Sequence, residues 1–377
     1  MAHMDRSWPI RQNVAGLAVY KPGKPIEEVQ RELGLQHVIK LASNENPLGP
    51  SPRVLEALAG ALEQVHFYPD GSGYRLKNAL AARYGITPDH VLLGNGSNEI
   101  VQLLSLAFLE PGDEAVMPVP SFPRYEPLTR LMNAVPREIK LQQFHLDLDG
   151  MARAINRRTK LVYICNPNNP TGTIVTRSQV DAFMQALPPH VVVVFDEAYY
   201  EYVTRDDYPD GLEYVKQGYK TIVLRTFSKI YGLAGLRIGY ALADPALVAY
   251  LERVREPFNV NSLAQVAALA ALEDMSYVAR VRRLNEEGKA YLYQEFTRLG
   301  IPFVPTEANF IFFDAGRNEK EVFQQMLRQG VIIRGGFGYD TWLRATIGTP
   351  AQNKKFISTL EQVLHGFHSS GVNSSLT

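Results

Sequence analysis

The chain has 377 residues, of which 46% are hydrophobic and 21% are charged, and these proportions are those of an ordinary globular protein. They exclude a disordered, collagen-like or coiled-coil chain. Thirty-nine basic residues balance 39 acidic ones, so no net charge draws the protein to nucleic acid or to an anionic membrane. We therefore expect neither a nucleic acid nor a membrane as a partner.

The single cysteine, Cys165, excludes an internal disulfide and a cysteine-cluster metal site. A lone thiol is typical of a reducing compartment, so we expect a cytoplasmic protein. The longest apolar stretches, such as residues 263–272, are shorter than the ~18 to 20 residues that a membrane span needs. Residues 1–5 lack the basic start and apolar core of a signal peptide.

The N-terminal 45 residues carry scattered proline and glycine and one amphipathic stretch at residues 25–33. Such a segment buries too little apolar surface to form a domain by itself. We expect residues 1–45 to form an arm that packs on a smaller domain or on a partner subunit.

Residues 46–274 contain short apolar runs, each followed by a loop rich in glycine, proline, asparagine or serine and then by a helical pattern. This alternation predicts an α/β domain with a mainly parallel sheet. Most runs are continuously apolar, as in strands that helices cover on both faces. The predicted strands are residues 91–93, 115–117, 161–165, 191–195, 222–225 and 239–243.

Residues 275–377 have a different pattern, which predicts a smaller α/β domain. Helices are expected near residues 281–299, 319–329 and 352–367, and strands at residues 309–313, 331–333 and 343–347.

Ligands of open parallel sheets bind outside the carboxyl ends of the strands, so the residues that follow each run are candidate site residues. Gly96, Ser97 and Asn98 follow the first run and open a helix, where free backbone N–H groups favour a phosphate. An ordinary glycine-rich turn is the alternative. A dinucleotide-binding loop is disfavoured, because Asp113 and Glu114 precede the next strand instead of ending it.

Further polar residues follow the later runs. Asp196 and Tyr199 follow one strand, and Lys229 follows the next within the segment Thr226-Phe-Ser-Lys229. Pyridoxal phosphate needs a lysine amine for its aldehyde, a carboxylate for its protonated ring nitrogen and an anion site for its phosphate. Lys229, Asp196 and the glycine-rich loop meet these needs in turn.

At this point the sequence resembles the fold-type I aminotransferases that use pyridoxal phosphate. Residues 166–172, Asn-Pro-Asn-Asn-Pro-Thr-Gly, match a loop of that family whose asparagine, here Asn169, binds the cofactor's ring oxygen. Tyr199 matches the phenol at the same oxygen, Asp196 the partner of the ring nitrogen, and Lys229 the Schiff-base lysine. The resemblance assigns further cofactor contacts to Gly96, Ser97, Asn98, Phe122, Thr226, Ser228 and Arg237.

Within that family, residues 20–28, 43–49 and 68–75 resemble the histidinol-phosphate aminotransferases most closely. The resemblance implies a homodimer with shared active sites, because the tyrosine that matches Tyr68 reaches the cofactor phosphate of the other subunit. It also implies substrate-binding roles for Tyr20, Asn169, Arg334 and Arg344, and a planar guanidinium suits a carboxylate or a phosphate.

The activity implied is a ping-pong transamination through Lys229 in histidine biosynthesis, in which L-glutamate and imidazole acetol phosphate give 2-oxoglutarate and L-histidinol phosphate. Three other functions remain open. The chain could be an aromatic amino acid aminotransferase, a pyridoxal-phosphate-dependent decarboxylase of a phosphorylated amino acid, or a non-catalytic binding module. The spacing of the histidines and the lone cysteine predicts no metal site.

Overall fold

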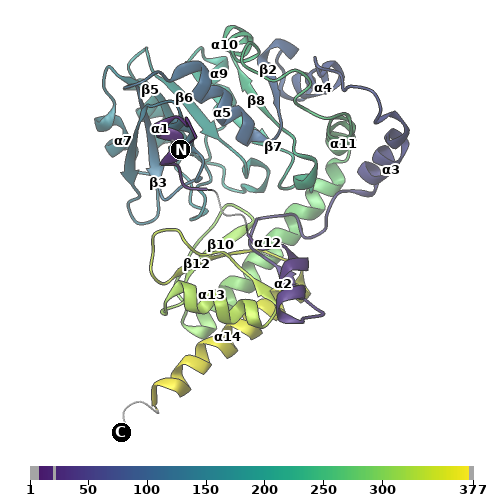
Figure 1. The fold of residues 1–377 in the computed structure, drawn as a ribbon, viewed down its shortest axis with the longest axis vertical. Coiled ribbons are helices and arrows are strands. Elements are labelled where there is room, and N and C mark those ends of the chain that lie inside the picture. Colours follow the sequence, from purple (N-terminus) through teal and green to yellow (C-terminus); the bar gives the residue numbers. More distant parts are fainter. Residues whose placement is uncertain (1–7, 20–22, 373–377) are drawn as a thin grey trace, which may run out of the picture.

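The computed structural model describes residues 8–19 and 23–372 of the chain. Figure 1 shows two bodies, one built on a large sheet and the other, which carries the C-terminal helix, on a small sheet. The boundaries proposed after residues 45 and 274 stay a prediction. Among the described residues, no helix is long and apolar enough to cross a membrane.

The large sheet has seven strands in the order β2-β8-β7-β6-β5-β3-β4. All neighbouring pairs from β7 to β4 are parallel, whereas β8 runs antiparallel to both β2 and β7. The mainly parallel sheet that the sequence predicts is therefore confirmed. The strands are β2 (Val91–Gly94), β3 (Glu114–Val119), β4 (Val135–Lys140), β5 (Thr159–Cys165), β6 (Val192–Asp196), β7 (Thr221–Thr226) and β8 (Gly239–Ala243).

One edge strand, β4, was not predicted. Its sequence, Val-Pro-Arg-Glu-Ile-Lys, is largely polar, and most of its residues are exposed. A proline is tolerated in a strand that has a free edge, because no ladder hydrogen bond is lost there. The continuous apolar run that is typical of the buried strands is absent from such an edge.

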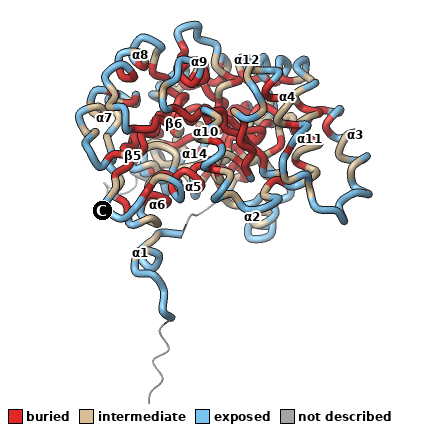
Figure 2. Tube along the Cα trace, turned by 90° about the horizontal axis from the view of Figure 1, so that it is seen from above, coloured by how far each residue is buried: buried red, intermediate tan, exposed pale blue. Residues whose placement is uncertain are grey.

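Helices cover both faces of the large sheet, as continuously apolar strands require. Alternate residues of β6 show this: Val192 and Val194 pack in one core cluster with α5, α6 and α10, and Val193 and Phe195 pack in the other with α8, α9 and α11. In Figure 2 the buried strands lie in the middle, between helices that carry exposed residues. The helices of this body are α3 (Pro52–Ala61), α4 (Tyr74–Tyr84), α5 (Ser97–Phe108), α6 (Tyr125–Leu131), α7 (Leu148–Ala154), α8 (Arg177–Gln185), α9 (Gly211–Lys216), α10 (Pro245–Leu251) and α11 (Ser262–Leu272).

The second body is built around an antiparallel sheet of order β12-β10-β9, which packs its apolar side chains with those of three helices. Its predicted helices and strands are present, with ends that differ by a few residues. The elements are α12 (Met275–Leu299), β9 (Phe303–Val304), β10 (Phe310–Asp314), α13 (Glu319–Arg328), β11 (Val331–Ile332), β12 (Trp342–Thr346) and α14 (Pro350–Val372).

The N-terminal segment contacts both bodies. The short helix α1 (Gln12–Ala15) lies on α6, where Asn13 Nδ2 donates to the carbonyl of Leu131 at 2.6 Å. The amphipathic stretch forms α2 (Ile26–Leu33), which buries Val29 against Leu327 and Ile332. The following strand, β1 (Ile39–Lys40), pairs in parallel with β11. The segment thereby brings residues 42–45 to the space between the two bodies.

Candidate active site

A cavity of about 310 Å³ lies where the large sheet faces the second body. The last residues of three parallel strands, Cys165, Asp196 and Thr226, all line it. This is the edge at which the sequence predicts a site. The predicted site residues that line the cavity are Ser97, Asn98, Phe122, Asn169, Asp196, Tyr199, Thr226, Ser228, Lys229, Arg237, Arg334 and Arg344.

Asp196 is 4% exposed and sits at the end of β6. Its Oδ2 accepts a hydrogen bond of 2.6 Å from the hydroxyl of Tyr125, and its Oδ1 is buried with no hydrogen-bond partner among the described residues. Burial raises the pKa of the Asp196 carboxyl, while the Tyr125 hydrogen bond opposes that rise. A buried carboxylate oxygen without a partner is costly, so this position fits a cationic N–H group.

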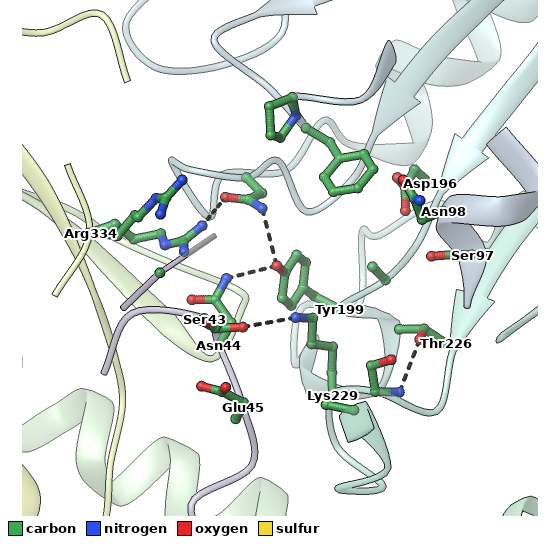
Figure 3. A pocket seen from close by; sticks show the side chains of 18 of the residues that line it. Ser43, Asn44, Glu45, Ser97, Asn98, Asp196, Tyr199, Thr226, Lys229 and Arg334 are labelled. Atoms are coloured by element: carbon green, nitrogen blue, oxygen red, sulfur yellow. Dashed lines mark hydrogen bonds between the residues drawn. The ribbon is translucent and has the colours of Figure 1, made fainter. Parts of the chain in front are cut away.

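Lys229 lines the same cavity as Asp196, and its Nζ donates to the carbonyl oxygen of Ser43 at 3.1 Å (Figure 3). Burial and the Arg344 guanidinium lower the pKa of the Lys229 amine to about 8, and the Glu45 carboxylate partly offsets this effect. The amine is therefore partly neutral near physiological pH, as a nucleophile or base requires.

Tyr199 presents its hydroxyl to the same cavity. The oxygen accepts hydrogen bonds from Asn44 Nδ2 at 2.8 Å and from Asn169 Nδ2 at 3.4 Å, as Figure 3 shows. Burial raises the pKa of this phenol, which is therefore a hydrogen-bond donor at neutral pH. Asn169 and Tyr199 thus offer two neighbouring polar groups to one bound atom.

A candidate anion site lies at the start of α5, where Ser97 and Asn98 line the cavity. Gly96 does not line the cavity but shapes its wall: its φ is 75°, and a Cβ atom there would lie 2.6 Å from Arg237 Nη2. The loop after β7 also lines the cavity, and in it the backbone N–H of Ser228 donates to Thr226 Oγ1 at 3.0 Å. Backbone N–H groups at a helix start, two hydroxyls and a guanidinium suit a phosphate group.

Two arginines line the other side of the cavity. Arg334 and Arg344 pair through their main chains, with N···O distances of 2.9 and 2.7 Å. Arg344 donates from Nη1 to Asn169 Oδ1 and from Nη2 to the carbonyl of Ala42 at 2.6 Å. These contacts fix the guanidinium plane, so that it can bind a planar carboxylate or a phosphate.

One predicted site residue lies away from this cavity. Tyr68 is 83% exposed and stacks on Phe258, with ring centroids 4.9 Å apart. Its expected role needs a second subunit, so it remains a prediction. Tyr20 lies outside the described residues.

Several residues that line or support the cavity were not predicted as site residues, notably Ser43, Asn44, Glu45, Phe337 and Tyr125. Ser43 contacts Lys229 through its backbone carbonyl oxygen, and every residue has such an oxygen, so the residue type does not indicate this contact. The polar run Ser43-Asn-Glu-Asn46 after a short strand is the one sequence signal that could have indicated this loop.

Pyridoxal phosphate fits the groups that are present. The buried Oδ1 of Asp196 lacks the partner that a protonated ring nitrogen would supply. A Cβ atom on Gly96 would fill the space beside Arg237, so the backbone leaves room for a phosphate. Among the residues that the structure describes, no cluster of three or more histidine, cysteine, aspartate or glutamate side chains could hold a metal ion.

The chain is similar to known proteins over most of its length. It is 52% identical to histidinol-phosphate aminotransferase 2 of Carboxydothermus hydrogenoformans, with 94% of this chain and 99% of that protein covered. It is 54% identical to the histidinol-phosphate aminotransferase of Moorella thermoacetica, with 94% of this chain and 92% of that protein covered.

Among solved structures, the histidinol-phosphate aminotransferase of Sinorhizobium meliloti in complex with pyridoxal 5'-phosphate superposes with a TM-score of 0.89, at 27% identity, covering 97% of this chain and 100% of that one. This confirms the expected fold-type I architecture. The family model for aminotransferase class I and II matches residues 36–360. The chain therefore belongs to the class I and II aminotransferases.

Proposed function

We propose that this protein transfers the amino group of L-glutamate to imidazole acetol phosphate, giving 2-oxoglutarate and L-histidinol phosphate in histidine biosynthesis. The observation that carries the proposal is one cavity that joins a lysine of lowered pKa, a buried carboxylate and two arginines. The names of the relatives that are about half identical to this chain support the choice of substrates.

Pyridoxal phosphate is the cofactor in this proposal, and it would supply an electron-accepting ring and an aldehyde that carries the amino group. Asp196 would hold its ring nitrogen, Tyr199 and Asn169 its ring oxygen, and Phe122 one face of the ring. The groups for its phosphate are those at the start of α5, from Gly96 to Asn98, together with Thr226, Ser228 and Arg237.

Lys229 carries the proton in the chemical step. With a pKa of about 8, its Nζ would take the proton from the Cα atom of the amino donor and move it to the carbon of the cofactor's aldehyde group. In the second half reaction it would move a proton the opposite way, to the carbon of the acceptor. Tyr199 donates a hydrogen bond and so stabilises negative charge that develops beside it. The Asp196 carboxylate keeps its bound N–H group protonated.

The two arginines bind the anionic groups of both substrates in turn. Glutamate offers carboxylates, whereas histidinol phosphate has no carboxylate and offers a phosphate instead. Arg344, which is held by Asn169 and Ala42, and the neighbouring Arg334 would therefore share this work. Tyr20 remains a candidate for the substrate phosphate on the resemblance alone.

We place the working enzyme in the cytoplasm as a homodimer. Five exposed apolar side chains within residues 62–74, here called the apolar patch, support the dimer; they are Leu62, Val65, Phe67, Tyr68 and Tyr74. Tyr68 would then reach the partner's cavity. We also propose that residues 46–274 and 275–377 form separate domains, with residues 1–45 as the arm.

The test is a panel of keto acids with glutamate as amino donor, read from the change in cofactor absorbance. Imidazole acetol phosphate is expected to exceed phenylpyruvate in kcat/KM by at least ~100-fold. Double-reciprocal plots should give parallel lines, as ping-pong kinetics require. Faster reaction with phenylpyruvate would indicate an aromatic aminotransferase, and release of carbon dioxide without an acceptor would indicate a decarboxylase.

A further inference from the structure

Asp196 receives its side-chain hydrogen bond from a residue outside the predicted site, Tyr125. This tyrosine begins α6 and is 1% exposed. Its ring stacks on that of Tyr163, with centroids 4.2 Å apart and planes 13° from parallel. The ring of Phe122 meets it edge-on at 5.5 Å. Aromatic rings on two sides therefore fix where the Tyr125 hydroxyl lies.

The contact makes the two oxygens of Asp196 different. Oδ2 accepts from the Tyr125 hydroxyl at 2.6 Å, whereas Oδ1 is buried and has no hydrogen-bond partner among the described residues. Burial and the Asp196 charge hold the pKa of the Tyr125 phenol well above its usual value, so this hydroxyl stays a donor. A donor at Oδ2 favours the ionised carboxylate and fixes its plane.

We propose that Tyr125 is a positioning residue for the cofactor: it fixes the Asp196 carboxylate so that Oδ1 stays available to the ring nitrogen of pyridoxal phosphate. The inference rests on the proposed function, because it needs that cofactor. The same short segment supplies Phe122 to the cavity. Residues 122–125 would thus provide both the surface against one face of the ring and the support for the acid at its nitrogen.

A purely structural role for Tyr125 has different consequences. If its hydroxyl only satisfied a buried acid, removing it would lower stability and weaken all ligands of the cavity alike. A positioning role predicts a loss that depends on the ring nitrogen itself. The informative measurement is therefore a comparison of two ligands that differ at that atom alone.

The experiment measures the dissociation constants of the apoprotein for pyridoxal phosphate and for its analogue with C–H in place of the ring nitrogen. The wild type is expected to prefer pyridoxal phosphate. In Tyr125→Phe this preference should fall roughly tenfold, the effect of one hydrogen bond to a charged group. Phenylalanine keeps the stack on Tyr163, so thermal unfolding of the apo variant should stay within a few degrees of wild type.

Two further variants separate the explanations. Tyr163→Phe is the matched control, because Tyr163 is equally buried and its hydroxyl makes no hydrogen bond to a described residue; its preference should equal that of the wild type. In an Asp196→Asn background, Tyr125→Phe should leave the remaining preference unchanged within about twofold, since the two residues act as one unit.

The outcomes distinguish this inference from the function on which it rests. A wild-type preference that survives Tyr125→Phe, or an equal loss in Tyr163→Phe, overturns the role of Tyr125 and leaves the aminotransferase proposal intact. A wild-type apoprotein that binds neither compound overturns both.

Discussion

Lys229 owes its expected reactivity to the side chains around it. Burial and Arg344 lower the pKa of its amine to about 8, while Glu45 acts in the opposite direction. At pH 7 roughly a tenth of such an amine is neutral, against fewer than about one in a thousand for an ordinary lysine. Glu45 is itself held by Lys40, whose Nζ lies 2.5 Å from Glu45 Oε1.

The first prediction concerns the pH dependence of this amine. In the apoprotein the rate of covalent capture of pyridoxal phosphate should rise with pH and level off above about 8, because only the neutral amine attacks. Glu45→Gln removes a charge that raises the pKa, so the inflection should move to lower pH. Stopped-flow absorbance measures the rates, and Glu63→Gln, in a residue that does not line the cavity, is the control. An inflection that moves upward would contradict the assigned role of Glu45.

A second prediction concerns Arg344, whose guanidinium is fixed by Asn169 and by the carbonyl of Ala42. Arg344→Lys keeps the charge but loses the planar pair of donors. The KM for glutamate should rise at least ~10-fold, with a smaller fall in kcat, because ground-state binding is lost. Steady-state kinetics measure both constants. Arg298→Lys, an exposed arginine paired with Glu361, should leave them unchanged.

At the scale of elements, the strand ends and one helix start build the site. β6 and β7 are adjacent and parallel, so Asp196 at the end of one strand and Thr226 at the end of the next face the same cavity. Beneath them the fully buried Arg225 pairs with Glu197 at 2.8 Å. Each of these residues is the chain neighbour of a site residue, and their cross-strand pair fixes the two strand ends relative to each other.

The third prediction tests the loop that opens α5. Gly96→Ala should raise the dissociation constant for pyridoxal phosphate at least ~10-fold, because the backbone has a positive φ and the new Cβ would press on Arg237. Gly235→Ala is the matched control: it lies two residues before Arg237, and, apart from its chain neighbours, no described residue would come within 4 Å of the added Cβ. Equal affinities of the two variants for pyridoxal phosphate in equilibrium dialysis would contradict the assignment of the phosphate site to this loop.

At the scale of the whole molecule, the apolar patch defined by Leu62, Val65, Phe67, Tyr68 and Tyr74 is the feature that a lone chain does not explain. These side chains are 56–83% exposed, and they follow one another from the short 3-10 helix after α3 (Leu62–Gln64) through the next turn to the start of α4. Several exposed apolar side chains within one short segment are typical of a protein interface. The opposite edge of the large sheet ends in the polar strand β4.

The fourth prediction concerns dimerisation, and it follows from the contrast between the apolar patch and the polar edge strand β4. Leu62→Glu combined with Phe67→Glu should weaken dimerisation at least ~100-fold, because two charges would be buried without partners. Sedimentation velocity measures the shift, and the transaminase activity should fall with it if Tyr68 serves the partner's site. Val135→Glu, an exposed apolar position on β4, is the control. A wild-type protein that sediments as a monomer would contradict the proposed dimer.

The chain sequence by itself determined the alternation of strands and helices and the polar residues at the strand ends. Parallel strands place their carboxyl ends at one edge, so Asp196, Tyr199 and Lys229 could be assigned to one site from their order alone. Most elements of the second body were likewise predictable from their apolar periods, because local periodicity reflects which face is buried, whereas the two-residue strand β9 was not predicted.

The tertiary structure alone decided the contacts that have no local signal. The direction of β8 and the edge strand β4 depend on pairing and exposure, not on an apolar run. Tyr125 meets Asp196 across 71 residues, and Ser43 meets Lys229 across 186. A backbone carbonyl looks the same in every residue, and a buried tyrosine resembles any core aromatic. Only folding determines which polar atom each of them meets.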